Sequence, residues 1–201
     1  MKKFISISPF QPSENMKNRV HYTPDNNPDL DYKETSFPIM TVINAYAEKN
    51  EEIEIITFVS DYDNARENYE IFKSEISELA QEKDFRYKLT EISVPYSDDI
   101  DTQLQMFEKL IDCMADEDRI YADITFGSKV MTQILNMGIN YGYRIHKNVS
   151  IGCIVYGKAD HRNKLYTVYD ETSLNYMDEI VRIMAETKVS NPAQRIKMLL
   201  K

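Results

Sequence analysis

One short stretch, YADITFGSKVM at residues 121–131, combines residue types that can hold an anion. Gly127 permits a tight turn with a positive φ, which brings the backbone close to a ligand. Ser128 can cap the following helix or donate its hydroxyl, and Lys129 falls in the first turn of that helix, where the helix dipole disfavours a cation. An anion between the ammonium group and the exposed N–H groups would resolve that conflict. The alternative is an ordinary strand–turn–helix joint with a solvated lysine.

Common nucleotide-binding and metal-binding patterns are missing from the chain. The P-loop pattern GxxxxGK[ST] and the dinucleotide pattern GxGxxG are both absent. His21, His146 and His161 are far apart, and none stands at metal-ligand spacing from a cysteine or carboxylate. We expect surface or helix-capping histidines and no metal site. Cys113 and Cys153 stand in apolar contexts and are expected to be reduced core thiols.

The elements that must position the 121–131 stretch follow from hydrophobic periodicity. The predicted strands are 4–10, 52–60, 87–96, 119–125, 149–157 and 164–170, and the predicted helices are 37–49, 64–83, 101–117, 128–145, 173–188 and 191–201. Strands separated by single helices pair in parallel through right-handed crossovers. The sequence therefore predicts an α/β fold with a Rossmann-like, mostly parallel sheet and helices on both faces. The last two strands are expected at an edge of the sheet, paired antiparallel.

Between the first strand and the first helix lies a polar segment, residues 11–36, rich in Pro, Asn and Asp. It is far longer than an ordinary loop, so it is either a functional lid or a segment ordered by contacts elsewhere. Tyr22 and Tyr32 within it can stack on bases, or can pack the segment down. Ser36 is the expected N-cap of the helix that follows, with Pro38 near its first turn.

Ligands of open α/β sheets bind outside the carboxyl ends of the strands, near the switch in strand order. Four strand ends offer polar groups: Ser6, Ser8 and Gln11 at the first, Ser60 and Asp61 at the second, Tyr96 and Ser97 at the third, and the 121–131 stretch at the fourth. The fourth is the richest. Asp123 within it is expected to stabilise the turn or to orient Lys129.

Length and charge narrow the class of protein. The chain has 201 residues, 42% of them hydrophobic, which suits one domain at residues 1–172 with a C-terminal helical extension at 173–201. With 33 acidic and 24 basic residues the net charge is −9, which argues against binding of long nucleic acid but leaves room for a local anion site. No signal peptide or apolar run of membrane-spanning length is present, so we expect a cytoplasmic protein without membrane contact.

The segment ADITFGSKVM, followed by LNMGINYGYRIHKNVSIGCIVYGK and LYTVYDETSLNYMDEIV, resembles the CRISPR-associated CARF-domain proteins. Members of that family carry a D-[ILV]-T-x-G-x-[KR] signature after the fourth strand and a small polar motif after the first. By this resemblance the second motif comprises Thr125, Phe126, Gly127, Ser128 and Lys129, and the first comprises Ser6, Ser8, Pro9 and Phe10. Phe126 departs from the family pattern, in which a glycine or another small residue is common. An aromatic ring there can stack on a base.

The resemblance implies a homodimer that binds a cyclic oligoadenylate, cA4 or cA6, across its two-fold axis. This ring is the second messenger of type III CRISPR immunity, and stand-alone family members often cleave it as ring nucleases. The chain is expected to be stand-alone, since no arginine precedes a histidine at the spacing of a HEPN ribonuclease motif. The chemistry needs no metal or cofactor, because a ribose 2′-hydroxyl attacks the adjacent phosphorus.

The resemblance also assigns roles to the motif residues. Lys129, Ser128 and Ser8 are the expected catalytic residues. The expected ligand-binding residues of the motifs are Ser6, Pro9, Phe10, Thr125, Phe126 and Gly127, and the strand ends add Gln11, Ser60 and Asp61. Neither motif contains a histidine, which predicts slow turnover.

Two other functions fit the sequence. One is a non-catalytic sensor or sponge for the same messenger, which contacts a partner protein through helix 173–188 and the basic residues Arg195, Lys197 and Lys201. The other is an ordinary Rossmann-like enzyme that acts on a nucleotide.

Overall fold

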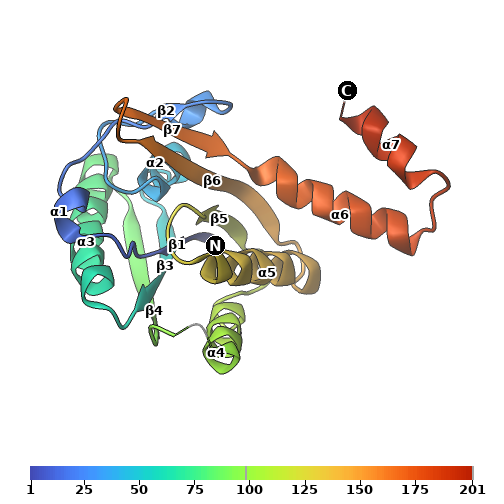
Figure 1. Cartoon of the computed structure of the whole chain (residues 1–201), viewed down its shortest axis with the longest axis horizontal. Coiled ribbons are helices and arrows are strands. Elements are labelled where there is room, and N and C mark those ends of the chain that lie inside the picture. Colours follow the sequence, from blue (N-terminus) through green and yellow to red (C-terminus); the bar gives the residue numbers. More distant parts are fainter. Residues whose placement is uncertain (98, 201) are drawn as a thin grey trace.

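The core of the protein is one seven-stranded sheet, seen in a computed structural model that describes residues 1–97 and 99–200. The strands are β1 (Lys2–Ile7), β2 (Thr23–Pro24), β3 (Glu52–Ser60), β4 (Arg86–Val94), β5 (Arg119–Asp123), β6 (Ser150–Asp160) and β7 (Leu165–Asp170). Their order across the sheet is β2-β7-β6-β5-β1-β3-β4 (Figure 1). The predicted α/β, Rossmann-like fold is confirmed.

Five neighbouring strands, from β6 through β5, β1 and β3 to β4, run parallel. β7 is antiparallel to β6, as expected for the last two strands. These two strands do not form the edge, however, because β2 pairs in parallel with β7 outside them. β2 has only two residues, too few for any periodicity. Its Pro24 lacks an N–H group, which suits an edge position.

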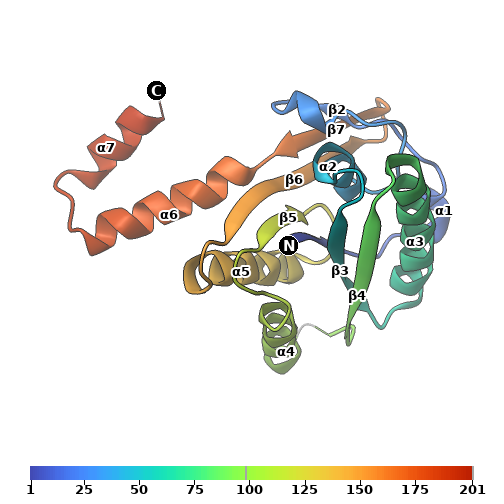
Figure 2. The same ribbon diagram turned by 180° about the vertical axis from the view of Figure 1, so that it is seen from behind.

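Helices cover both faces of the sheet (Figures 1 and 2). α2 (Ile39–Tyr46) and α3 (Asp63–Lys83) pack on one face, and α4 (Ile100–Ile111) and α5 (Lys129–Ile145) pack on the other. Successive strand residues point to opposite faces, so Phe4 and Ile55 join the first hydrophobic cluster while Ile5 and Ile56 join the second. In the part of the chain that is described, none of the helices is both long and apolar enough to cross a membrane.

The polar segment 11–36 is ordered against α3 and the β7 edge. It contains α1 (Ser13–Met16), β2 and a 3-10 turn, η1 (Pro28–Leu30). At its end, the buried carboxylate of Glu75 on α3 accepts hydrogen bonds from the Thr35 hydroxyl at 2.5 Å and from the Ser36 N–H at 3.2 Å. The Ser36 hydroxyl donates to the Met16 carbonyl, which ties the end of the segment to its start. These bonds fix a segment whose composition alone predicts a loop.

Ser36 is not the N-cap of the next helix, and that prediction is wrong. α2 begins at Ile39, and no side chain at its N-cap position, Pro38, bonds to the first turn. The Ile39 N–H instead donates to the carboxylate of Asp123 on β5, at 3.1 Å. The buried carboxylate of Asp123 therefore takes the place of a local capping side chain and accepts a hydrogen bond from an otherwise unsatisfied N–H group at the helix start.

The last two helices extend away from the sheet (Figures 1 and 2). α6 (Thr172–Glu186) follows β7 directly and is fastened to α5 by Arg144, which bonds Asp178 at 2.6 Å and Glu179 at 2.9 Å. α7 (Pro192–Leu199) has no buried residue. The extension predicted from residue 173 thus corresponds to two helices of different attachment, one fixed to the body and one not.

Truncation of Leu135 tests the α5 side of the core. Leu135 is fully buried, so Leu135→Ala removes apolar burial and leaves a cavity between α5 and the sheet. We expect the free energy of unfolding to fall by about 2–5 kcal/mol, measured by urea denaturation. Leu165→Ala is the matched control, because Leu165 is 63% exposed and its truncation should change stability by less than about 0.5 kcal/mol. Equal effects of the two substitutions would contradict this packing.

Candidate functional site

The site predicted from the motifs lies at the switch in strand order. β1 sits at the centre of the sheet, between β3 and β5. The chain runs outward from β1 through β3 to β4 and then returns to form β5 on the opposite side of β1. Such a reversal opens a crevice outside the carboxyl ends of the two central strands. Residues 8–11 follow β1 and residues 124–128 follow β5, so both predicted motifs meet at this crevice.

The turn after β5 has the geometry expected of it. Gly127 adopts a φ of +92°, and a Cβ atom there would lie 2.8 Å from the Cγ2 atom of Ile7. A larger residue is therefore excluded both by backbone conformation and by space. Ser128 is the N-cap of α5, and its hydroxyl oxygen accepts a hydrogen bond from the Met131 N–H at 3.2 Å. The turn thus ends in a helix start with its geometry fixed on both sides.

Lys129 is the first residue of α5, and its side chain is exposed. Among the described residues, its ammonium group has no hydrogen-bond or ion-pair partner, and no acidic residue stands in the first turn of α5. The backbone N–H groups of Gly127, Ser128 and Lys129 likewise meet no acceptor within that part of the chain. A cation beside the positive end of a 17-residue helix is unfavourable without an anion. This arrangement therefore favours a bound anion.

The segment after β1 contributes less to the crevice than predicted. Ser6 and Ser8 are 5% and 3% exposed, and Pro9 is also buried. The Ser8 hydroxyl donates to the Ala65 carbonyl at 2.6 Å, so it holds the start of α3. The expected roles of Ser6 and Ser8 in contacting a ligand do not fit this burial. Asn68 fixes the segment by donating to the Pro9 carbonyl at 2.9 Å and to that of Gln11.

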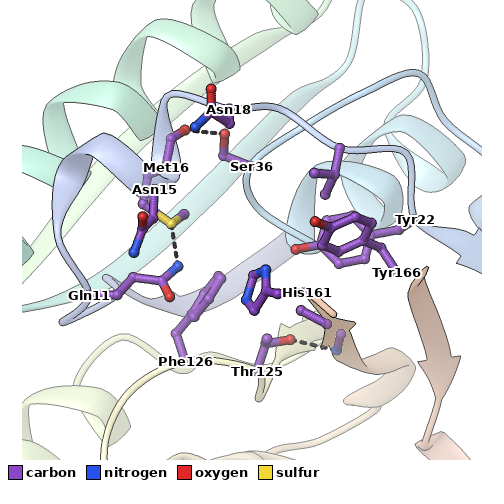
Figure 3. A pocket seen from close by; sticks show the side chains of 13 residues that line it. Gln11, Asn15, Met16, Asn18, Tyr22, Ser36, Thr125, Phe126, His161 and Tyr166 are labelled. Atoms are coloured by element: carbon purple, nitrogen blue, oxygen red, sulfur yellow. Dashed lines mark hydrogen bonds between the residues drawn. The ribbon is translucent and has the colours of Figure 1, made fainter. Parts of the chain in front are cut away.

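A cavity of about 410 Å³ opens on one side of the turn, beneath the 11–36 segment. It is lined by Gln11, Asn15, Met16, Asn18, Val20, Tyr22, Ser36, Thr125, Phe126, Gly157, Ala159, His161 and Tyr166. Figure 3 shows amide side chains on one wall and aromatic rings on the other. The volume falls in the range of small-molecule sites. Gln11, Thr125 and Phe126 are the predicted ligand-binding residues that meet here.

A smaller cavity of about 230 Å³ lies on the other side of the same turn. Its lining is Phe10, Ser60, Pro95, Tyr96, Ser97, Met106, Ser128 and Met131. At its rim Tyr96 stacks on Tyr62 with ring centroids 4.8 Å apart, and Phe10 meets Tyr96 edge-on at 5.5 Å. Tyr96 is 60% exposed, so part of its ring is accessible to a flat ligand.

Asp123 fixes the turn from below. Its carboxylate accepts hydrogen bonds from the Ile39 N–H at 3.1 Å, from the Thr125 N–H at 2.8 Å and from the Thr125 hydroxyl. The Thr125 oxygen in turn accepts a bond from the Gly157 N–H at 2.7 Å. Burial raises the pKa of Asp123 to about 6, although these bonds oppose the shift. Asp123 stabilises the turn, as one of its two expected roles requires, and it does not contact Lys129.

The remaining predicted residues lie away from the two cavities. Asp61 is exposed and pairs with Arg66 at 3.0 Å. His21 pairs with Asp31, and His146 pairs with Asp116. Cys153 is buried and Cys113 partly so, and burial raises the pKa of both thiols. Among the residues that the structure describes, no group of three or more His, Cys, Asp or Glu side chains is placed to hold a metal ion.

Sequence reasoning missed two kinds of cavity residue. His161 and Tyr166 come from the β6–β7 hairpin, with ring centroids 5.8 Å apart. Asn15 and Asn18 come from the α1 region of the polar segment. Nothing local marks these residues, because the hairpin turn ADHRNK and the segment around α1 both have the composition of ordinary solvated turns. Only the folding of β7 and the 11–36 segment over the end of β5 brings them to the site.

Replacing Asp123 by asparagine tests whether burial raises the pKa of this carboxylate. The folded-state pKa of about 6 lies above the ordinary value near 3.9, so the folded protein binds this proton more tightly than the unfolded chain does. The stability that this gives at acidic pH is lost as the pH rises from about 4 through about 6. Two pKa units correspond to about 3 kcal/mol. We therefore expect the free energy of unfolding of the wild type, measured by urea denaturation, to fall by up to about 3 kcal/mol relative to that of Asp123→Asn between pH 4 and pH 7.5.

The control for this measurement is Asp25→Asn, because Asp25 is exposed. Its stability should follow the wild type at every pH. If Asp123→Asn also follows the wild type, the buried carboxylate does not titrate in the way its surroundings require.

No protein-family model matches the chain, and no curated protein matches it. Sequence similarity therefore does not show its family. The function proposed below rests on the geometry of the two cavities and the turn between them, together with the motif at residues 122–131.

Proposed function

We propose that the protein binds a cyclic oligoadenylate, cA4 or cA6, across a homodimer and cleaves it as a metal-independent ring nuclease. The observation that supports this most is the Lys129 ammonium beside the N–H groups of Gly127 and Ser128, at the switch point of the sheet. None of these groups has a partner within residues 1–97 and 99–200. The activity is the one that the resemblance to CRISPR-associated CARF-domain proteins implies. It places the protein in the cytoplasm, in antiviral defence.

A nucleotide ring suits the surroundings of this turn. Phosphate groups would meet Lys129 and the backbone N–H groups, where a net charge of −9 is locally reversed. Bases would meet aromatic rings on both sides, since Phe126 lines the larger cavity and Tyr96 and Phe10 line the smaller one. Stacking on aromatic rings contributes about 1–3 kcal/mol per base in single-strand binding proteins. The turn between the cavities therefore suits a phosphate with a nucleoside on either side.

The cleavage step transfers a phosphoryl group within the ring. A ribose O2′ attacks the adjacent phosphorus, the P–O5′ bond breaks, and a linear product with a 2′,3′-cyclic phosphate results. The protein must hold these three atoms in line and neutralise charge on the phosphoryl oxygens. Lys129 supplies the positive charge, and the N–H groups of residues 127–129 supply hydrogen-bond donors.

An apolar surface on α4 and α5 supports the homodimer. Leu104, Met137 and Ile145 are 59%, 51% and 63% exposed, and the partly buried Phe107 and Tyr141 lie among them. Exposed apolar groups of this kind are typical of protein interfaces. Since α5 begins at Lys129, a two-fold contact through this surface, with its axis along α5, would bring two phosphate-binding turns to one side of the dimer.

A non-catalytic sensor or sponge is the second candidate, and one observation favours it. Ser8, the serine expected to position the ribose or phosphate, is buried and bonded to the Ala65 carbonyl. A protein that only binds the ring has no need of that hydroxyl. In this case the projecting helices α6 and α7 would contact the partner protein.

Incubation with radiolabelled cA4 and cA6 in the presence of EDTA separates the candidates. We expect slow conversion of one ring to a linear product with a 2′,3′-cyclic phosphate, since neither motif contains a histidine. EDTA should not stop it, because no step uses a metal. Sedimentation should show a dimer. Binding of the ring without cleavage would support the sensor. If the protein neither binds nor cleaves either ring, the Rossmann-like nucleotide enzyme is the remaining candidate.

Removal of the Lys129 charge tests the role of the turn. Lys129→Ala should lower the single-turnover cleavage rate by about 10²–10³-fold, the cost of losing one group that stabilises transition-state charge, and should weaken ring binding. Lys147→Ala is the matched control, since Lys147 is exposed just beyond the opposite end of α5 and should keep the wild-type rate. Unchanged cleavage by Lys129→Ala would overturn the assigned role.

A further inference from the structure

The β6–β7 hairpin places one histidine in the larger cavity. His161 stands in the turn that follows β6, and its ring meets Tyr166 of β7 edge-on, with centroids 5.8 Å apart. In the view of Figure 3, the imidazole points into the cavity, with Phe126 on one side and Tyr22 and Tyr166 on the other. His161 is also exposed, so the ring is accessible to a ligand and to solvent.

Among the described residues that line this cavity, His161 alone carries an imidazole, the side chain most often used as a general base. The phenols of Tyr22 and Tyr166 face it, and the other polar groups are amides and hydroxyls. No carboxylate or ammonium group belongs to the lining. A neutral imidazole is consequently the one strong proton acceptor that the cavity offers to a ligand.

His161 and Lys129 flank the same turn. Thr125 and Phe126 line the cavity that holds His161, and Lys129 stands three residues after Phe126. The hairpin is held there through Thr125, whose oxygen accepts the Gly157 N–H at 2.7 Å. β6 also pairs directly with β5, with Val155 opposite Asp123. A phosphate held at the Lys129 turn would thus have its ribose on the side of the cavity that His161 lines.

We infer that His161 is the general base of the proposed cleavage reaction. The inference rests on the proposed function and adds a residue outside both sequence motifs. As O2′ forms its bond to phosphorus, its proton passes to the imidazole nitrogen of His161. The P–O5′ bond breaks with its electron pair on O5′, which takes a proton from solvent. The imidazolium then returns its proton to solvent, so atoms and charge balance.

Substitution of His161 tests this assignment by a readout that a structural role would not move. A positioned general base accelerates such a step by about 10²–10⁴-fold, so His161→Ala should lower the single-turnover rate by that factor. The wild-type rate should depend on pH through its general base, and the variant should lose that dependence. Free imidazole added to the buffer should restore part of the rate in His161→Ala only. Ring affinity should stay unchanged, because the base acts on the transition state.

The matched control is His21→Ala, which removes an exposed histidine that does not line this cavity. It should keep the wild-type rate and pH profile. If the wild type cleaves the ring and His161→Ala cleaves it equally fast with the same pH profile, the inference falls and the proposed function stands. Loss of both binding and cleavage without rescue by imidazole would assign His161 a binding role and overturn the inference. A wild type that cleaves neither ring overturns the proposed cleavage and this inference together.

Discussion

The arrangement of the site depends on one buried carboxylate. Asp123 joins the end of β5 to the start of α2 through the Ile39 N–H and to the following turn through Thr125. Thr125 extends the connection to β6 through the Gly157 N–H. Burying an acid is unfavourable at neutral pH, as its raised pKa shows. In return, the hydrogen bonds of Asp123 and Thr125 hold β5, α2 and β6 in place around the turn at residues 125–129.

The turn itself divides two different environments. On one side the 11–36 segment and the β6–β7 hairpin enclose amides and aromatic rings, and on the other an exposed tyrosine cluster lies at the ends of β1, β3 and β4. The positive end of α5 and Lys129 lie between them. A ligand that has negative charge between two flat apolar groups matches this order of environments, and a nucleotide ring is such a ligand.

The fold could be predicted because its strands are long and apolar, as in β3, which is buried from Ile53 to Ser60. The turn at Gly127 and the cap at Ser128 could also be predicted, since both are local. The prediction that Ser36 caps α2 was wrong, because the Ile39 N–H at the helix start bonds instead to the carboxylate of Asp123, 84 residues further along the chain. The burial of Ser8 could not be predicted, because a small hydroxyl with one bond to a carbonyl can be buried as easily as exposed. The place of His161 in the cavity could not be predicted from sequence, because only the packing of the β6–β7 hairpin brings it there.

The attachment of α7 has a consequence for how the molecule comes apart. A helix of eight residues is marginal in water, and no side chain of α7 is fully buried against the described part of the chain. Unfolding of α7 should therefore barely change the stability of the sheet, and α7 and the sheet belong to separate cooperative units. The tail can fray, be clipped or exchange neighbours while the crevice at the strand ends keeps its shape.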